Sequence, residues 1–228
     1  HAFWRDFRKV VKDANPDCYI LGEIWHEGMP WLRGDQYDSL MNYPLTQAIT
    51  DYFALSAFDK HSFINAVNTS YMAYPRNVNE AMFNLLDSHD TTRILSLCQG
   101  DTRKAKLAYL FMFTQVGAPC IYYGGEIGMD GGRGMGSENN RKCMEWNVGN
   151  HDLDFKAFIK EMIALRKANP DLNQPNLDWV NVNDADCIAY RRADRLFVLN
   201  NSEHDKQIEL EGRSVSIKAF GYLIAKVQ

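Results

Sequence analysis

Two acidic residues stand where short apolar segments end. Glu23 lies within CYILGEI at 18–24, and Asp90 follows AMFNLL at 81–86, within LLDSHDTTR. Two carboxylates facing one cavity can hydrolyse a glycosidic bond, because one protonates the leaving oxygen while the other attacks or stabilises an oxocarbenium-like sugar. The proton donor then needs a pKa raised by burial or by a nearby negative charge. Strand-end carboxylates also cap helices, so a structural role is the open alternative.

Aromatic and polar residues beside these carboxylates suit a sugar-binding cleft. Trp25, two residues after Glu23, offers apolar surroundings and a flat face for a sugar ring. His89 can donate a hydrogen bond to a sugar hydroxyl. Asn42 ends a further apolar run, YDSLMNY at 37–43. The residue types therefore favour glycoside chemistry at the ends of several strands.

Alternating strands and helices are expected to position these residues. Apolar runs predict buried strands at 18–24, 37–43, 81–86 and 120–123. Helical spacing predicts helices at 2–14, 46–53, 60–73, 102–115 and 153–167. This alternation indicates an α/β fold with a parallel sheet, and in a (β/α) barrel the chemistry lies at the carboxyl ends of the strands. Four such units make half of an eight-stranded barrel.

The pattern changes near residue 177. Short β-type segments separated by Asp, Asn and Gly follow, at 187–192, 195–201, 206–211, 215–220 and 222–227. They predict a small antiparallel β-sandwich. We therefore expect two domains: a partial catalytic barrel over 1–175 and a C-terminal β-sandwich over 176–228.

Composition excludes several other classes of protein. The chain has 228 residues, with 25 Lys and Arg against 29 Asp and Glu, a net charge of −4 that argues against nucleic-acid binding. No apolar run reaches the roughly 20 residues needed to cross a membrane. The five cysteines form no C-x-x-C pair, which indicates reduced thiols in a cytoplasmic protein. No carboxylate cluster has calcium-loop spacing, so no metal is expected in this segment.

Four motifs carry a family resemblance. GEIWH, MNYP, LLDSHDTTR and GAPCIYYGGEIGM, in this order, resemble motifs of the α-amylase clan of glycoside hydrolases. GEIWH followed by PWLRGDQYDSLMNYP resembles the branch of cyclomaltodextrinases, maltogenic amylases and neopullulanases. The resemblance implies a C-terminal fragment, with strands five to eight and flanking helices of a (β/α)₈ TIM barrel followed by the small antiparallel β-sandwich.

The resemblance also implies roles for individual residues. Glu23 matches the general acid/base, and Asp90 matches the aspartate that stabilises the transition state and grips sugar hydroxyls. His89 matches a histidine that binds those hydroxyls, and Trp25 and His26 match the acceptor side of the cleft. The remaining matches near the cleft are Asn42, Tyr43 and Arg93. For Arg93, a salt bridge on the following helix is the alternative to sugar contact.

Other parts of the family pattern are absent or altered. The R-x-D motif with the nucleophilic aspartate and the D-x-x-x-N-H motif do not occur in their strand contexts, so the isolated chain is expected to be inactive. This chain has GGE at 124–126 where the family branch usually has Gly-Asp-Glu. It has SENNRK at 137–142 where the branch usually has a stretch with Asp-Pro-Asp-Cys-Arg. We therefore transfer no binding role to Asp130 or Glu138, and Arg141 is expected to bridge loop and barrel.

The resemblance implies a retaining hydrolase of α-1,4-glucosidic bonds in cyclodextrins, pullulan or maltooligosaccharides. The alternatives are an α-glucan transferase, of the glucanotransferase or branching type, which excludes water, and a non-catalytic glucan-binding or assembly fragment. Expected partners are the glucan or cyclodextrin substrate, the N-terminal half of the same barrel and a second copy in a homodimer. No cofactor is expected here, and calcium is expected only in the N-terminal part.

Overall fold

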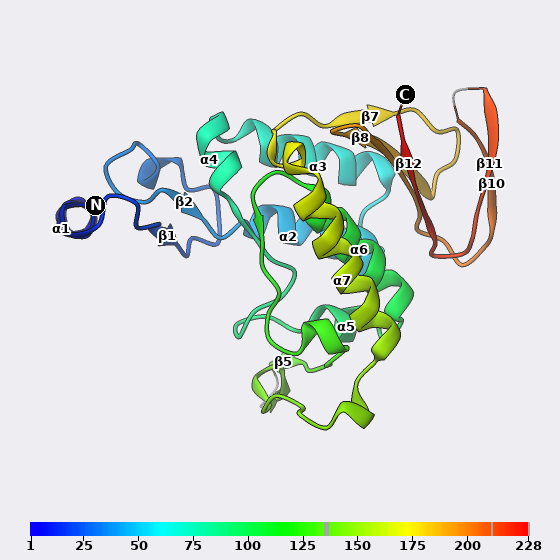
Figure 1. Ribbon diagram of the computed structural model, residues 1–228, viewed down its shortest axis with the longest axis horizontal. Coiled ribbons are helices and arrows are strands. Elements are labelled where there is room, and N and C mark those ends of the chain that lie inside the picture. Colours follow the sequence, from blue (N-terminus) through cyan, green and yellow to red (C-terminus); the bar gives the residue numbers. More distant parts are fainter. Residues whose placement is uncertain (135–136, 211, 228) are drawn as a thin grey trace.

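The computed structural model describes residues 1–134, 137–210 and 212–227. Helix α1 lies at one end and the β10–β11 hairpin at the other, with the main helices between them (Figure 1). The helices are α1 (Ala2–Ala14), α2 (Tyr43–Ile49), α3 (Lys60–Met72), α4 (Arg76–Ala81), α5 (Ile94–Leu97), α6 (Thr102–Thr114) and α7 (Leu153–Ala168). A π-helical turn, Thr50–Ala54, extends α2. None of the described helices is long and apolar enough to cross a membrane.

Short parallel strands form the first sheet region. They are β1 (Leu21–Gly22), β2 (Ser39–Leu40), β3 (Phe83–Asn84) and β4 (Ala118–Pro119). Strands β1 and β2 pair in parallel, as do β3 and β4, and a bridge between Met41 and Phe83 joins the two pairs. The strands therefore run side by side in chain order, and their carboxyl ends meet at one edge.

The strand bounds differ from the sequence prediction. The strands predicted at 18–24, 37–43 and 81–86 contain β1, β2 and β3, but each ladder is only two residues long. The strand predicted at 120–123 is wrong, because β4 begins earlier, at Ala118. Gly117 permits this turn: its φ is +102°, and a Cβ there would lie 2.5 Å from the Met82 carbonyl oxygen. Pairing ends where the Cys120 amide donates to Asn84 O at 2.7 Å.

Helix starts are defined by polar caps. Pro44 lies in the first turn of α2, where its missing N–H costs no hydrogen bond. Asn42 caps this helix, and its Oδ1 accepts the Leu45 amide at 3.4 Å. Aspartates at 59, 101 and 152 cap α3, α6 and α7 in the same way. These caps explain why the long helices begin close to their predicted starts.

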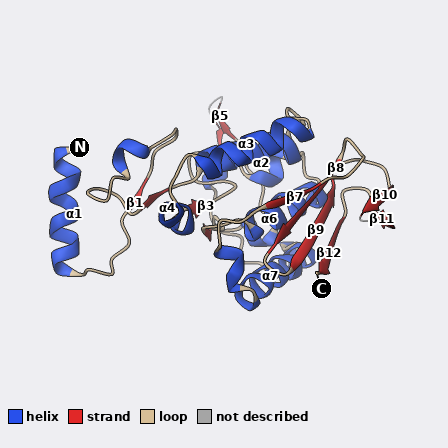
Figure 2. Cartoon of the chain, turned by 90° about the horizontal axis from the view of Figure 1, so that it is seen from above, coloured by secondary structure: helices blue, strands red, loops and turns tan. Residues whose placement is uncertain are grey.

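The C-terminal strands form an antiparallel sheet, seen in red in Figure 2. Its order is β12 (Tyr222–Lys226), β9 (Arg195–Asn200), β8 (Cys187–Arg192), β7 (Asp178–Val180), and a hairpin of β10 (Lys206–Leu210) and β11 (Arg213–Ile217) packs beside it. Strand β5 (Arg133–Gly134) pairs antiparallel with β6 (Ser137–Glu138).

One continuous core joins the helices to the C-terminal sheet. Helix α6 is its centre, and Leu107 to Met112 are fully buried. The Tyr190 hydroxyl of β8 lies 2.8 Å from Thr114 Oγ1, at the end of α6. Buried Arg192 donates to the carbonyl oxygens of Thr114 at 3.0 Å and Leu172 at 2.5 Å. The sheet is therefore anchored to the helical layer by both apolar packing and buried hydrogen bonds.

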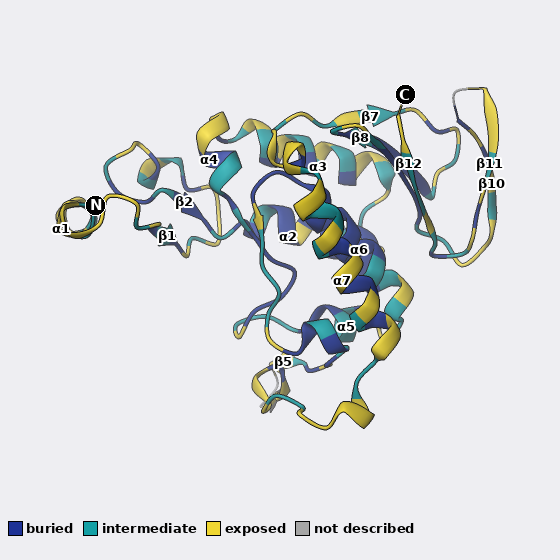
Figure 3. Ribbon diagram, viewed as in Figure 1, coloured by how far each residue is buried: buried dark blue, intermediate teal, exposed yellow. Residues whose placement is uncertain are grey.

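Helix α1 keeps an apolar row on its outer face. Phe3, Phe7 and Val10 are 67%, 40% and 68% exposed, and the helix is largely yellow in Figure 3. On the inner face, Arg8 Nη1 and Lys12 Nζ bind Asp38 at 2.7 and 3.0 Å. Asp38 stands directly before β2, so charge ties α1 to the strands. Trp4 and Val11 also pack against the apolar cluster that contains Tyr37, so only part of the helix's apolar surface faces outward.

Candidate active site

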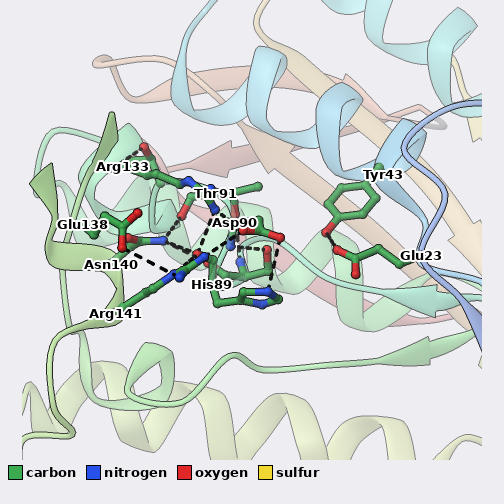
Figure 4. Close-up of polar contacts among 11 residues, drawn as sticks. Glu23, Tyr43, His89, Asp90, Thr91, Arg133, Glu138, Asn140 and Arg141 are labelled. Carbon is green, nitrogen blue, oxygen red and sulfur yellow. Dashed lines mark hydrogen bonds and ion pairs between the residues drawn. The ribbon is translucent and has the colours of Figure 1, made fainter. Parts of the chain in front are cut away.

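Glu23, Trp25 and Tyr43 form one group at the strand ends. Glu23 follows β1, and the Tyr43 hydroxyl at the start of α2 donates to its Oε1 at 3.2 Å (Figure 4). The Trp25 and Tyr43 rings are parallel within 9°, with centroids 3.9 Å apart. Burial, together with the charges of Glu23 and Asp90, raises the pKa of Tyr43 to about 12, so this hydroxyl remains a donor. Glu23 itself is exposed and accessible to a substrate.

His89 and Asp90 lie in the loop after β3, surrounded by basic groups. Asp90 Oδ1 accepts from Arg141 Nη2 at 2.9 Å and from Arg133 Nη1, and Asp90 Oδ2 lies 3.2 Å from His89 Nε2 (Figure 4). The hydrogen bond from Arg133 is the main cause that holds the pKa of Asp90 below its ordinary value. Asp90 is therefore ionised at neutral pH, which suits charge stabilisation and hydroxyl binding rather than proton donation.

A buried amide holds the backbone of this loop. Asn140 Nδ2 donates to the carbonyl oxygens of His89 and Thr91, both at 2.9 Å. Arg141 Nε donates to the same His89 oxygen at 2.8 Å. The loop that presents His89 and Asp90 is thus fastened to the segment after β6.

Arg93 lies behind the loop rather than in a cleft. It is fully buried, its Nη1 donates to Tyr123 O at 2.7 Å and its Nε donates to Asn140 O at 3.1 Å. Its guanidinium also packs over the Tyr122 ring at 4.6 Å. With no exposed surface to offer a sugar, Arg93 supports the site through hydrogen bonds to loop carbonyls. Within the described residues, no ion pair joins Arg93 to a carboxylate of the following helix.

Asn42 and His26 differ in burial. Asn42 is only 6% exposed, and its Nδ2 donates to Asn84 Oδ1 at 2.9 Å, which links β2 to β3. His26 is exposed, but its Nδ1 lies 2.7 Å from Glu27 O and its ring lies 5.9 Å from that of Trp31. Asn42 braces the strand ends, whereas His26 belongs to the loop after β1.

An open groove lies beside Trp25 and Tyr43, and Glu23, His89 and Asp90 are not among its lining residues. It has a volume of about 480 Å³, and its lining includes Trp25, Tyr43, Thr91 and Thr92. These residues follow β1, β2 and β3, so the groove lies at the shared carboxyl edge of the strands. Among the described residues, no three His, Cys, Asp or Glu side chains are grouped to hold a metal ion.

Three residues important to this arrangement escaped sequence reasoning. Asn140 and Arg133 lie in a Gly-rich polar stretch without periodicity, so no local signal marked them. Asp87 stood inside the LLDSHDTTR motif as a second acidic residue, and this could have drawn notice. It is 3% exposed, accepts the Ile94 amide at 2.8 Å, and burial raises its pKa to about 6.

The fold and site agree with one protein family. Parallel strands with Glu23 and Asp90 at their carboxyl ends are the arrangement of an α-amylase-type catalytic fold. The family model described as "Alpha amylase, catalytic domain" matches residues 1–212. The chain belongs to the α-amylase family.

Individual relatives show which members of the family this chain resembles. A cyclomaltodextrinase of Bacillus sp is 49% identical over 208 residues, which are 89% of this chain and 37% of the relative. A maltogenic α-amylase of Bacillus acidopullulyticus is 43% identical over 217 residues, 92% of this chain and 36% of the relative. A solved cyclomaltodextrinase structure superposes with a TM-score of 0.89 at 42% identity, covering 97% of this chain and 42% of that one.

These relatives confirm the predicted resemblance to the branch of cyclomaltodextrinases, maltogenic amylases and neopullulanases. A neopullulanase of Thermoactinomyces vulgaris is 39% identical over 214 residues. In each case the chain spans less than half the length of the protein that it matches.

Proposed function

We propose that this chain is the C-terminal half of a (β/α)₈ TIM barrel, with strands five to eight, followed by a small β-sandwich, in a retaining α-glucan hydrolase. The substrates are α-1,4-glucosidic bonds in cyclodextrins, pullulan or maltooligosaccharides. The observation that carries the proposal is the placement of Glu23 and Asp90 after parallel strands, with both charges acting on the Tyr43 hydroxyl. The match to hydrolases at 49% and 43% identity supports the reaction class.

In the proposed reaction, Glu23 protonates the leaving oxygen and then activates water for the second displacement. Its exposure leaves Glu23 accessible to substrate, and its Oε1 accepts from the neutral Tyr43 hydroxyl. Asp90 remains ionised and stabilises the oxocarbenium-like sugar, with His89 beside it as a hydroxyl donor. Trp25, stacked on Tyr43 and 51% exposed, provides the platform for a sugar ring.

The nucleophilic aspartate is proposed to come from an N-terminal half that completes the barrel. Within the described residues, β1 pairs only with β2 and β4 pairs only with β3, so both outer edges of the parallel strands are open to further strands. The exposed apolar row of α1 is a second surface for this half to cover. We call the chain together with this N-terminal half the completed enzyme.

The other proposals concern organisation. The division into 1–175 and 176–228 follows the change from mixed α/β to antiparallel strands, with the shared core as their contact. Cytoplasmic location is supported by a relative named intracellular maltogenic amylase, from Bacillus subtilis, at 46% identity. Homodimer formation, and calcium confined to the N-terminal half, belong to the same proposal.

A matched pair of substitutions tests the reaction. Glu23→Gln in the completed enzyme should lower kcat on cyclodextrin by on the order of 10²- to 10⁴-fold, since a general acid contributes this much. Glu27→Gln is the control: Glu27 lies four positions further along the same loop, and its Oε1 accepts the Met29 amide, a bond that the oxygen of glutamine can also make. Equal activity of both variants would refute the assignment of Glu23.

Two further measurements separate the alternatives. The chain alone should release no reducing sugar, and adding the N-terminal half should restore hydrolysis. Product analysis then distinguishes hydrolase from transferase, because dominant transfer products would overturn hydrolysis as the main reaction. Activity of the purified chain alone would contradict the proposed origin of the nucleophile.

A further inference from the structure

We propose that Asn140 is a positioning residue of the active site, which holds the backbone of residues 88–91 so that His89 and Asp90 are presented to the substrate. This inference rests on the proposed function and extends it to a residue that contacts neither sugar nor reacting atoms. It also concerns a position where the chain departs from the motif that it otherwise resembles, since SENNRK replaces the stretch with Asp-Pro-Asp-Cys-Arg.

The hydrogen bonds of Asn140 determine the orientation of its amide. The residue is fully buried, and Nδ2 lies 2.9 Å from His89 O, 2.9 Å from Thr91 O and 3.5 Å from Ser88 O. All three partners are carbonyl oxygens, so only the nitrogen can face them. In the described part of the chain, Oδ1 has no hydrogen-bond donor. The side chain of Asn140 thus binds the loop through its Nδ2 donor.

The backbone of Asn140 is held as firmly as its side chain. Its carbonyl accepts Arg93 Nε at 3.1 Å, and its amide donates to Gly132 O at 3.2 Å. Arg93 in turn is fully buried and also holds Tyr123 O. The path from this buried guanidinium through Asn140 to the loop carbonyls therefore has no exposed link.

Asn140 and the two arginines that hold this loop differ in burial. The side chains of Arg133 and Arg141 are 35% and 40% exposed, and exposed ion pairs contribute little and are screened by salt. A buried carbonyl that loses its donor pays the full desolvation penalty. The His89 carbonyl also accepts from Arg141 Nε at 2.8 Å and from Arg133 Nη1 at 3.1 Å, so the distinct contribution of the buried amide is its bond to Thr91 O at 2.9 Å.

Asn140→Asp is the sharpest test, because it exchanges the donor for an acceptor at nearly constant shape. The ionisable groups around the new carboxyl are His89 and Asp90 on the loop, Arg93 behind it, Arg133 on β5, Glu138 and Arg141 on its own segment, and Tyr122 and Tyr123 after β4. Ionised, the carboxylate repels the three carbonyl oxygens; protonated, it regains one donor.

In the completed enzyme, Asn140→Asp should lower kcat by on the order of 10- to 100-fold at neutral pH, the equivalent of one or two lost buried hydrogen bonds. Relative to wild type, part of this loss should be recovered as the pH falls to about 5. Asn140→Leu should show a similar loss without recovery. Asn139→Asp, an exposed neighbour on the same turn, controls for added charge and should retain the wild-type pH profile.

Amide hydrogen exchange gives a readout independent of activity. The amides of Ser88, Asp90 and Thr91 donate within the loop at 2.8, 3.1 and 3.4 Å, and their exchange should accelerate at least roughly tenfold in Asn140→Asp. Faster exchange in an enzyme without hydrolytic activity would support the positioning role and refute the proposed function. A folded Asn140→Asp with wild-type exchange and kcat, or equal effects in Asn139→Asp, would overturn the positioning role.

Discussion

Replacing Asp87 by asparagine should stabilise the fold at neutral pH. Asp87 is 3% exposed and accepts the Ile94 amide at 2.8 Å, next to the loop of the candidate site. Burial raises its pKa from 3.8 to about 6, although the Ile94 amide and the charge of Arg93 oppose the rise. Asn keeps an acceptor for the same amide but never carries the buried charge.

The sign and size of the stability difference between Asp87→Asn and wild type follow from proton linkage. A raised pKa means that the folded state holds this proton at pH values where the unfolded state has released it, so stability declines as the pH rises from 3.8 through about 6. The shift of about two pKa units corresponds to about 3 kcal/mol. Asp87→Asn should therefore exceed wild type in free energy of unfolding by up to about 3 kcal/mol above pH 6, and by much less near pH 4.

The assay is urea denaturation of wild type and variant across this pH range, with midpoints converted to free energies by the measured slope. Asp101→Asn is a control of opposite sign, because the hydrogen bond from Arg103 lowers the pKa of Asp101. Asp101→Asn should lose stability relative to wild type at neutral pH, and the loss should shrink in acid. A stability difference for Asp87→Asn that is independent of pH would refute the reasoning.

Three further substitutions probe the site and its support. Tyr43→Phe removes the donor 3.2 Å from Glu23 Oε1 and should lower kcat by on the order of tenfold, measured in the completed enzyme; unchanged kcat would remove this bond from the mechanism. Trp25→Ala should raise KM several-fold with a smaller effect on kcat, in line with the loss of about 1 kcal/mol of ring packing, and a selective fall in kcat would count against a platform role. Arg93→Met leaves two loop carbonyls unpaired and should cost about 3 kcal/mol of unfolding free energy in urea titrations; a neutral effect would show that the carbonyls find other donors.

Local periodicity was sufficient to predict the long helices. Helix α1 was predicted with its exact bounds, and α3, α6 and α7 within one residue at each end. Helical hydrogen bonds join residues four apart, so the information lies within the segment. The extent of a strand is not determined within its own segment. Strand β4 lies two residues before the predicted run because Gly117 turns the chain at Met82, a partner 35 positions away.

The candidate site likewise has a part that the sequence predicts and a part that depends on distant segments. Sequence motifs placed Glu23, His89 and Asp90 at strand ends, and the position of a residue after a buried strand is enough for that inference. The partners of Asp90 lie 43 and 51 positions away, in a loop without periodic signal, and Arg93 donates to the carbonyl of Asn140 from that same loop. Residue type and local spacing thus determined which groups could react. Only the tertiary structure decided which candidate residues are exposed, as Glu23 and His89 are, and which are buried behind the loop, as Arg93 is, because burial and charge pairing depend on segments distant in the chain.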